Sequence, residues 1–410
     1  MAKSEYIILR RIPLGEISSR SNELVDAHAI SNKAQSARPP SRLTVAELDE
    51  RDAGDLRRDP EVLLAPAVPL SLIRPLIASE DSDEKTLDAA RAAGISWGVH
   101  EVAPTAALDD GAATTVAILD TGIDASHAAF KGVDLRRENF SNSSNDGDAN
   151  GHGTHCAGTI FGRDVDGVRI GIARGVRKAL IGKVLNDEGR GDTAIFARAT
   201  QWALDNGARV ISMSLGFDFN ALFEDLKAKG NPRAQAFSMA LSHYRDTVRL
   251  FDSIIQTLNA SGIVLRTGAV VVAAAGNESQ RRETPPCIVD VSLPAAAEGV
   301  VSVGAVEKST NGFEVASFSN ANAKLWAPGV GIVSARVGGG LAVSQGTSMA
   351  APHVSGAAVL WSEWLARRNP RSGPAELKAR LTASARVTGF SPTVADAERG
   401  SGLIQAPPGP

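Results

Sequence analysis

The sequence predicts an α/β fold of three layers, αβα, in which helices cover both faces of a mainly parallel central sheet, with a small α+β domain in front of it. The first observation is a set of short apolar runs, near residues 115–119, 179–185, 208–213, 268–275 and 300–305. Unbroken runs of this kind are typical of parallel strands buried on both faces. The second is that helical patterns alternate with the runs, near residues 153–161, 193–205 and 347–366, as successive βαβ units require.

The third observation is the different pattern at the N-terminus, which predicts a separate α+β domain over residues 1–75. Residues 6–9 and 61–65 are predicted strands, and residues 44–47 form a capping-box sequence that predicts the start of a helix. An unrelated adaptor domain or a disordered arm is the alternative for this segment.

A linker and the main domain follow. Residues 76–96 include the acidic stretch 80–85 and are polar enough for an exposed linker, where we expect a processing cut. Residues 97–405 carry the α/β pattern and form the second domain, and residues 406–410 are a short tail.

Composition excludes several classes of protein. The chain has 410 residues, of which 43% are hydrophobic, so a core of conventional size can form. The net charge of −3 comes without a basic stretch for nucleic acid or a run of about 18 apolar residues for a membrane span. Two cysteines give no disulfide framework, and the first residues lack the apolar core of a secretory signal. We expect neither nucleic-acid nor membrane partners and a cytoplasmic location, with secretion as the alternative.

A serine at the start of a helix is the first candidate for chemistry. Residues 346–353, Gly-Thr-Ser-Met-Ala-Ala-Pro-His, open an apolar run that reaches Trp364. Pro352 is tolerated in the first helical turn, where an N–H has no intrahelical partner. The positive end of the helix dipole favours a negative charge beside Ser348, which suits a nucleophile attacking a carbonyl. The alternative is a serine that only caps the helix.

Three further motifs supply the groups that a serine nucleophile needs. A serine hydroxyl requires a base to take its proton and a carboxylate to orient that base. His152 lies in a glycine-flanked motif that begins another helix of small residues, and Asp120 follows the apolar run 115–119. Catalytic groups of parallel sheets gather at that carboxyl edge. Asn277 follows another buried run and offers a side-chain donor for an oxyanion.

Together these motifs resemble the four signature blocks of the subtilisin-like serine proteases. They are Asp-Thr-Gly at 120–122, Gly-His-Gly-Thr-His at 151–155, Ala-Ala-Gly-Asn at 274–277 and Gly-Thr-Ser-Met-Ala at 346–350, in the family order. The resemblance implies that Ser348 attacks the scissile carbonyl, that His152 is the base and that Asp120 orients it. It also implies that Asn277 and the Ser348 backbone N–H hold the oxyanion.

The same resemblance implies a substrate cleft and an inhibitor within the chain. Ser214, Leu215 and Gly216 match the family segment that pairs with substrate backbone and forms one wall of the primary specificity pocket. The opposite wall and the fourth subsite fall to Ala274, Ala275, Gly276 and Gly191. Residues 1–75 resemble the family pro-domain, which fills the cleft with its own C-terminal tail.

A cysteine stands beside the proposed base. Cys156 follows His155 in the helix that begins at His152, and its position predicts a buried thiol beneath that histidine. We do not expect it to be the nucleophile, because no second histidine and asparagine pair is available to activate it.

The strong calcium site common in the family lacks its ligands here. Calcium needs six to eight oxygen ligands, but Ala129 and Val165 stand at positions expected to supply side-chain oxygens, and Arg163 adds a positive charge. We expect no cofactor and no dependence on that site. A weak calcium site is left open at Asp164 with Asp166, or around Asp146 and Asp148.

The connection from Gly216 to Val270 is longer than is usual in the family. Apolar residues recur in it at steps of four and three, at Phe237, Leu241, Tyr244, Val248, Phe251, Ile255 and Leu258. This spacing predicts one helix that packs on the sheet and ends at Gly262. A partner-binding arm is the alternative, because so long a stripe offers more apolar face than the sheet needs.

The sequence therefore predicts a serine endopeptidase that acts on protein or peptide substrates and is made as a self-processed zymogen. One alternative is an acyl transferase or peptide cyclase, which would pass the same acyl group to an amine instead of water. Another is a non-catalytic peptide-binding protein. The four intact motifs argue against mere binding, because gripping a peptide does not require all four.

Overall fold

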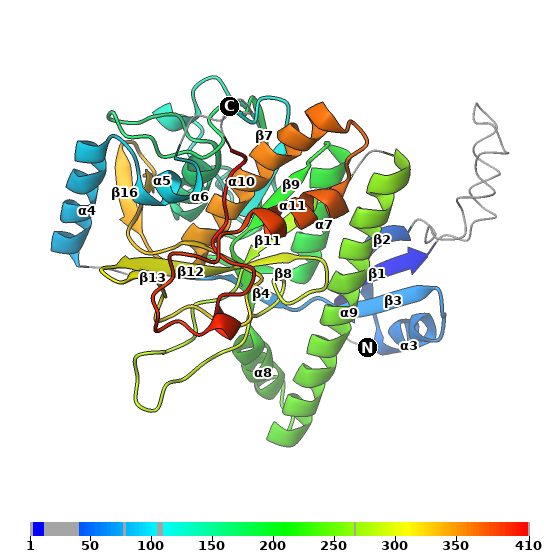
Figure 1. Ribbon diagram of the computed structural model, residues 1–410. Coiled ribbons are helices and arrows are strands. Elements are labelled where there is room, and N and C mark those ends of the chain that lie inside the picture. Colours follow the sequence, from blue (N-terminus) through cyan, green and yellow to red (C-terminus); the bar gives the residue numbers. More distant parts are fainter. Residues whose placement is uncertain (1–2, 12–40, 77–78, 105–109, 266–267, 409–410) are drawn as a thin grey trace, which may run out of the picture.

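The structure of the protein, a computed structural model, describes residues 3–11, 41–76, 79–104, 110–265 and 268–408 (Figure 1). Residues 12–40 of the predicted N-terminal domain, 77–78 of the predicted linker and 409–410 of the tail lie outside the described residues, as does the side chain of Leu258. None of the described helices is both long and apolar enough to cross a membrane.

The centre of the molecule is a sheet of mostly parallel strands. They are β5 (Val116–Asp120), β6 (Asp134–Asn139), β7 (Lys178–Lys183), β9 (Val210–Met213), β11 (Val270–Ala274), β12 (Val301–Ser309), β13 (Gly312–Val315) and β14 (Leu325–Pro328). Within the described residues the sheet has eight strands, in the order β13, β12, β11, β9, β5, β7, β6, with β14 also paired to β12. Of these pairings, only that of β12 with β13 is antiparallel.

Helices cover both faces of this sheet. The helices of the main domain are α5 (Trp97–Val102), η1 (Ala128–Phe130), α6 (His152–Phe161), α7 (Thr193–Asp205), α8 (Phe219–Ala228), α9 (Arg233–Leu265), α10 (Thr347–Arg368), α11 (Pro374–Ser384) and η2 (Asp396–Glu398). Val116 and Ile118 of β5 share a core with α6 and α10, whereas Ala117 and Leu119 share a core with α7 and α9. Successive strand residues face opposite sides, so the sheet is buried on both. The predicted three-layer α/β fold is confirmed.

The N-terminal unit is a three-stranded antiparallel sheet in the order β2, β1, β3. Its elements are β1 (Ser4–Arg11), β2 (Ser41–Leu48), α3 (Glu50–Arg57) and β3 (Val62–Pro66). One face packs against α3 through Ala53, Val62 and Leu64. The other face contributes Ile7 and Leu9 to the core that contains α7 and α9, so this unit is docked on the main domain.

One prediction in this unit is wrong. The capping-box sequence at residues 44–47 lies inside β2, and α3 begins at Glu50 instead. Asp49 caps that helix, because its carboxylate accepts hydrogen bonds from the N–H groups of Arg51 and Asp52. The pairing of β2 along the whole of β1 outweighs the local helix signal.

The predicted linker, residues 76–96, is largely helical. It contains α4 (Glu80–Ala93), which has acidic residues in its first turn, where they complement the helix dipole. The helix ends at Gly94, whose φ of 67° favours glycine. Ala90 is buried in the main core, so this segment is anchored to the domain rather than free.

The long connection after residue 216 forms α8 and α9, which lie together at the edge of the molecule (Figure 1). Leu222 and Leu226 of α8 pack with Ala236 and Ala240 of α9. α9 continues past the predicted end at Gly262 to its last residue, Leu265. A glycine inside a helix costs only about 1 kcal/mol, so a single glycine is a weak stop signal.

The apolar stripe of α9 is only partly covered. Phe251 and Ile255 are buried in the core, whereas Phe237 and Leu241 near the start of the helix are 49% and 48% exposed. The prediction that this helix packs on the sheet therefore holds for its middle turns.

Two small sheets complete the main domain. One contains β4 (Pro69–Leu72), β8 (Arg190–Asp192) and β10 (Leu215–Phe217), and the other contains β15 (Ile332–Ala335) and β16 (Leu341–Ser344). The first joins the end of the N-terminal unit to the main domain, because β4 lies between β10 and β8 and is antiparallel to both.

Candidate active site

Asp120 and His152 meet at the carboxyl edge of the central sheet. Asp120 is the last residue of β5, and His152 is the first residue of α6. His152 Nδ1 lies 2.7 Å from Asp120 Oδ1, and both residues are buried. The carboxylate therefore holds Nδ1 as the donor, which leaves Nε2 as the nitrogen that accepts a proton.

The charge of Asp120 outweighs burial in setting the protonation of His152. Burial alone lowers the pKa of His152, but the Asp120 carboxylate raises it, and the result is a pKa well above the ordinary value. Burial also raises the pKa of Cys156 and keeps that thiol neutral, so Asp120 is the charge responsible. Attraction between protonated His152 and the Asp120 carboxylate stabilises the folded protein. This contribution is fully present below the ordinary histidine pKa, and it is lost as the pH rises through the raised pKa of His152.

Ser348 lies in α10, and Asn277 lies in the loop that follows β11. Ser348 is in the first turn of α10 and is fully buried. Asn277 follows β11, and its Oδ1 accepts hydrogen bonds from the backbone N–H and the hydroxyl of Thr347, at 2.9 and 2.8 Å. Thr347 Oγ1 in turn accepts the Gly276 N–H at 3.2 Å. Thr347, the residue before Ser348, therefore fixes the Asn277 amide beside the start of α10.

Comparisons with known proteins agree with this geometry. The model of the subtilase family matches residues 111–402. The chain belongs to the subtilase family. Its relatives include subtilisin DY of Bacillus licheniformis, which is 35% identical over 68% of this chain and 86% of its own length. Subtilisin E of Bacillus subtilis (strain 168) is 30% identical over 84% of this chain and 76% of its own length. The subtilisin-like protease 1 of Trichophyton equinum is 30% identical over 76% of this chain and 52% of its own length.

Family and relatives together make this subtilase a serine endopeptidase. They do not favour the acyl transferase, the peptide cyclase or the non-catalytic binding protein that the sequence leaves open.

A segment of the chain itself runs through the cleft of this subtilase. We call residues 69–76, which begin with β4, the strap. Leu72 of the strap pairs with Leu215, and Leu70 pairs with Gly191 on the opposite side. Beyond β4, the Ile73 N–H donates to the Ser214 carbonyl at 3.3 Å, and the Leu76 N–H donates to the Gln345 carbonyl at 2.9 Å. The strap therefore follows the path that a bound peptide backbone would take.

The strap presents two successive carbonyls to Ser348 and Asn277. Ser348 Oγ donates to the Ile73 carbonyl oxygen at 2.9 Å, and Asn277 Nδ2 donates to the Arg74 carbonyl oxygen at 3.0 Å. Attack on one carbonyl requires the nucleophile and the oxyanion donor to act on that same group. Ser348 and Asn277 hold different carbonyls here, so this arrangement of the strap does not meet that requirement.

Four of the residues predicted to form the cleft lie along the strap. Ser214, Leu215 and Gly216 contact it on one side and Gly191 on the other. A Cβ at Gly216 would lie 3.3 Å from Ile73 Cγ1, so the glycine lets this buried isoleucine sit close to the backbone. Ala274 ends β11, and Ala275 and Gly276 follow it. The Gly276 N–H donates to Thr347 Oγ1, which links this segment to the site.

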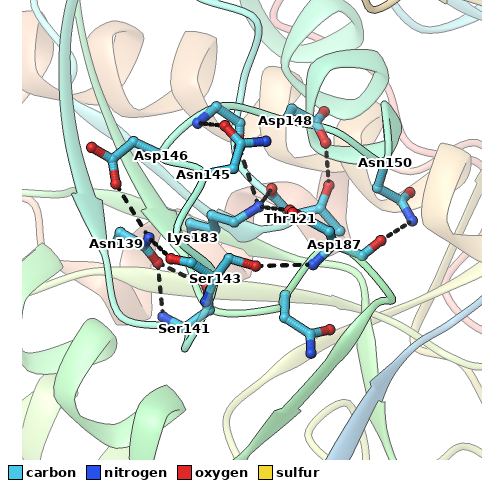
Figure 2. A network of polar contacts seen from close by, with 12 residues as sticks. Thr121, Asn139, Ser141, Ser143, Asn145, Asp146, Asp148, Asn150, Lys183 and Asp187 are labelled. Carbon is cyan, nitrogen blue, oxygen red and sulfur yellow. Dashed lines mark hydrogen bonds and ion pairs between the residues drawn. The ribbon is translucent and has the colours of Figure 1, made fainter.

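A buried lysine braces the turn that follows Asp120. Lys183 ends β7 beside Asp120, and its side chain is 2% exposed. Its Nζ donates to the carbonyls of Thr121 at 2.7 Å and Gly147 at 3.1 Å, and to Asp187 Oδ1 at 2.8 Å. Figure 2 shows Lys183 at the centre of this network. One ammonium group thus ties three loops together behind the catalytic carboxylate.

Asp187 contributes to this network in a pH-dependent way. Its hydrogen bond with Lys183 lowers the pKa of the Asp187 carboxyl. This contact stabilises the fold above the ordinary aspartate pKa, and the contribution is lost as the pH falls through the lowered pKa.

Asp148 joins the same turn to the helix of the base (Figure 2). Its Oδ1 accepts the Thr121 hydroxyl at 2.9 Å and the Gly151 N–H at 2.8 Å. Its Oδ2 accepts the Thr154 N–H at 2.8 Å and the Thr154 hydroxyl at 2.7 Å. A carboxylate at a helix N-terminus is favoured by the helix dipole, and here it also fixes α6 relative to Thr121.

Cys156 lies beneath the imidazole, as predicted from the sequence. Its Sγ is 3.8 Å from His152 Nδ1 and 3.4 Å from the Ser348 carbonyl oxygen, and the residue is 1% exposed. With Asp120 and His152 it forms the cluster of potential metal ligands found among the described residues. The thiol packs between α6 and α10, against Met349 and Ile332.

Sequence reasoning missed three contributors to the site: Lys183, Thr347 and Gln345. Lys183 carried a signal, because a lysine that ends an apolar strand predicted to be buried must find acceptors for its three N–H groups. The sequence gives no signal for Thr347 or Gln345, because their roles depend on which loop and which part of the strap the fold brings to them.

Proposed function

We propose that this serine endopeptidase cuts peptide bonds with Ser348 as nucleophile, His152 as base and then acid, Asp120 as the residue that orients His152, and Asn277 as oxyanion donor. The observation that supports this assignment most strongly is the strap, which lays peptide carbonyls against Ser348 Oγ and Asn277 Nδ2. The 2.7 Å contact between Asp120 and His152 supports the other half of the assignment.

In this mechanism Ser348 Oγ bonds to the scissile carbonyl carbon while its proton passes to His152 Nε2. The carbonyl oxygen becomes an oxyanion that Asn277 Nδ2 and the Ser348 N–H stabilise. Collapse of this intermediate breaks the C–N bond, and His152 returns the proton to the leaving amine. Water then attacks the acyl-enzyme by the same route and releases the acid product.

We propose further that the N-terminal unit is an inhibitor within the chain and that the enzyme is made as a zymogen. Two observations support this. Ile7 and Leu9 are buried against the main domain, and the strap fills the cleft with Ser348 and Asn277 on different carbonyls. Removal of the inhibitor then requires the Ile73 carbonyl to turn in place, so that its oxygen reaches Asn277 Nδ2 while its carbon stays beside Ser348 Oγ.

The first test is self-processing. We expect the full chain to cut itself at the Ile73–Arg74 bond and to expose Arg74 as a new N-terminus, whereas the Ser348→Ala form stays full length. Processing should accelerate as the pH rises, because the Asp120 carboxylate keeps the pKa of His152 high and only the neutral ring accepts a proton. The measurement is N-terminal sequencing and mass spectrometry of both forms over a pH series.

Other N-termini would correct the assignment. Pro75 as the new terminus would mean that the Arg74 carbonyl is attacked, and a terminus within residues 76–96 would restore the linker prediction. A full-length chain that is active without any cut would show that residues 1–75 are a permanent domain.

We also propose that the enzyme has no dependence on a tight calcium site. Asp164, one of the residues left open as a ligand, is paired with Arg174 at 2.9 Å. Arg163 places its guanidinium on the carbonyls of Phe161 and Val176, at 3.1 and 2.8 Å. Around Asp146 and Asp148, the Lys183 ammonium already binds the nearby carbonyl of Gly147. At both places where the sequence leaves a weak calcium site open, an arginine or lysine side chain thus already binds nearby oxygen atoms.

Thermal unfolding of the Ser348→Ala form with excess EDTA, beside a sample in millimolar calcium, tests this proposal. We expect melting temperatures that differ by less than about 3 °C. A tight site held at about 1,000 times its Kd would contribute about 4 kcal/mol. A loss of more than about 5 °C in EDTA would therefore reveal such a site.

A further inference from the structure

The strap continues beyond β4 into a contact with the long insertion of this chain. If Ile73 is counted as the first residue on the amino side of the scissile bond, Pro69 is the fifth and Val68 is the sixth. The Val68 N–H donates to Thr193 Oγ1 at 3.0 Å, and the Thr193 N–H donates to the Val68 carbonyl at 3.0 Å. Both backbone groups of Val68 are therefore bound by the first residue of α7.

The Val68 side chain fills an apolar pocket built by α8 and α9. Val68 is fully buried, and it is the residue from outside the insertion in a buried cluster formed with Leu222, Leu226, Ala236 and Ala240. Ala236 and Ala240 are four residues apart on α9, so they lie on one face of the helix. Their small side chains leave room for a branched aliphatic group between the two helices.

We infer that α8 and α9 form a distal subsite that binds a branched aliphatic side chain at the sixth residue on the amino side of the bond to be cut. This inference rests on the proposed function, since it assumes that a substrate binds along the same path as the strap. The backbone contacts support it because Thr193 extends the pairing of β4 with β8 by one more residue. The buried pocket supplies side-chain selectivity at that residue. The insertion therefore acts in substrate choice.

The chemistry of the pocket defines what it selects. Its buried walls are apolar, so a carboxylate there would lose its hydration without a partner. Full burial of a valine side chain corresponds to a factor of about 10 to 100 in binding. Peptides and proteins with valine at this position should therefore be cut in preference to those with aspartate.

The test uses the enzyme obtained from the full chain and peptides that end in an aminocoumarin leaving group after isoleucine. One peptide carries residues 67–73, Ala-Val-Pro-Leu-Ser-Leu-Ile, a second has aspartate in place of the valine, and a short one carries residues 69–73 only. We expect kcat/KM to be about 10 to 100 times higher for the valine peptide than for the aspartate peptide. Equal values would overturn the inference, because only the sixth residue differs.

Two variants locate the selectivity. Ala240→Leu fills the pocket and should bring the ratio of the valine to the aspartate peptide close to 1. Leu241→Ala is the matched control, because Leu241 is the next residue of α9 and is 48% exposed, and it should leave the ratio unchanged. Each ratio is measured within one preparation, so a smaller folded fraction cancels. A ratio that persists in Ala240→Leu would place the selectivity elsewhere and refute the pocket.

The short peptide separates this inference from the function on which it rests. If the short peptide is cut and the valine and aspartate peptides have equal kcat/KM, the proposed protease activity stands and the distal subsite is refuted. Failure to cut any of the three peptides, with activity on a casein digest intact, would show that Ile73 is not the first residue before the cut, and the inference would fail with that assignment.

Discussion

Ser348→Ala and His152→Ala should each lower kcat for peptide hydrolysis by about 10⁶, a magnitude taken from subtilisin, a relative in which such changes have been measured. The double variant should be no slower than either single one, because the nucleophile is useless without its base. Asp120→Asn should lose about 10⁴, since the ring then no longer holds the correct tautomer. Asn277→Ala should lose about 10²–10³ in kcat. Single-turnover and steady-state kinetics on one chromogenic peptide measure all four.

Folding is the alternative cause of such losses and is controlled separately. Ser362→Ala changes a buried serine of the same helix, α10, away from the site, and should keep full activity. Melting temperatures of all variants should stay near that of the parent chain. Undiminished turnover by a folded Ser348→Ala form would refute the mechanism, because Ser348 then could not be the residue that carries the acyl group.

Lys183→Met should cause the largest loss of stability expected from a single substitution at the site. The change removes the donor of the Thr121 and Gly147 carbonyls, and each buried acceptor left without a partner costs about 1–3 kcal/mol. We expect the free energy of unfolding to fall by about 2–5 kcal/mol, which lowers the melting temperature of a chain of this length by about 2–6 °C. Thermal unfolding in a Ser348→Ala background, where the chain cannot digest itself, measures this.

Activity should fall in the same variant with Ser348 present. The turn after Asp120 loses its brace, and a displacement of about 1 Å at a catalytic group can cost about 10²-fold in rate. Lys183→Arg keeps the charge and should recover part of the loss. Lys178→Met is the matched control, because Lys178 begins the same strand and is partly exposed, so it should change stability by less than about 0.5 kcal/mol. Equal effects of Lys183→Met and Lys178→Met would show that the network does not brace the site.

The α/β fold and the four chemical groups could be predicted because local sequence carries them. The runs that became β5, β7, β9, β11 and β12 are apolar enough to be recognised as buried strands without knowledge of their neighbours. Asp120, His152, Asn277 and Ser348 each follow a strand or begin a helix. The position of a residue at an element boundary is a local property, so the sequence alone indicates which side chains gather at one sheet edge.

Local signals failed where pairing with a distant segment competed with them. Residues 44–47 have the sequence of a helix start, but they pair with β1 and form a strand. Gly262 is a plausible helix end, but α9 continues through it to Leu265. In both places the preference of a few residues amounts to about 1 kcal/mol, which the contacts of a whole element readily exceed.

The sequence by itself thus determined the class of this protein and the residues available for catalysis. It also determined the chain order of the main elements of the core, which are the strands β5, β7, β9, β11 and β12 and the helices α6, α7 and α10. Tertiary structure alone decided that the strap lies in the cleft with the Ile73 carbonyl at Ser348, that Val68 is enclosed by α8 and α9, and that Lys183 binds carbonyls of two separate loops. Each of these contacts joins segments far apart in the chain. A side chain has many possible acceptors or pockets, and its partner is fixed only when the whole core is packed. This is because the free energy that orders such a contact is shared among all the elements around it.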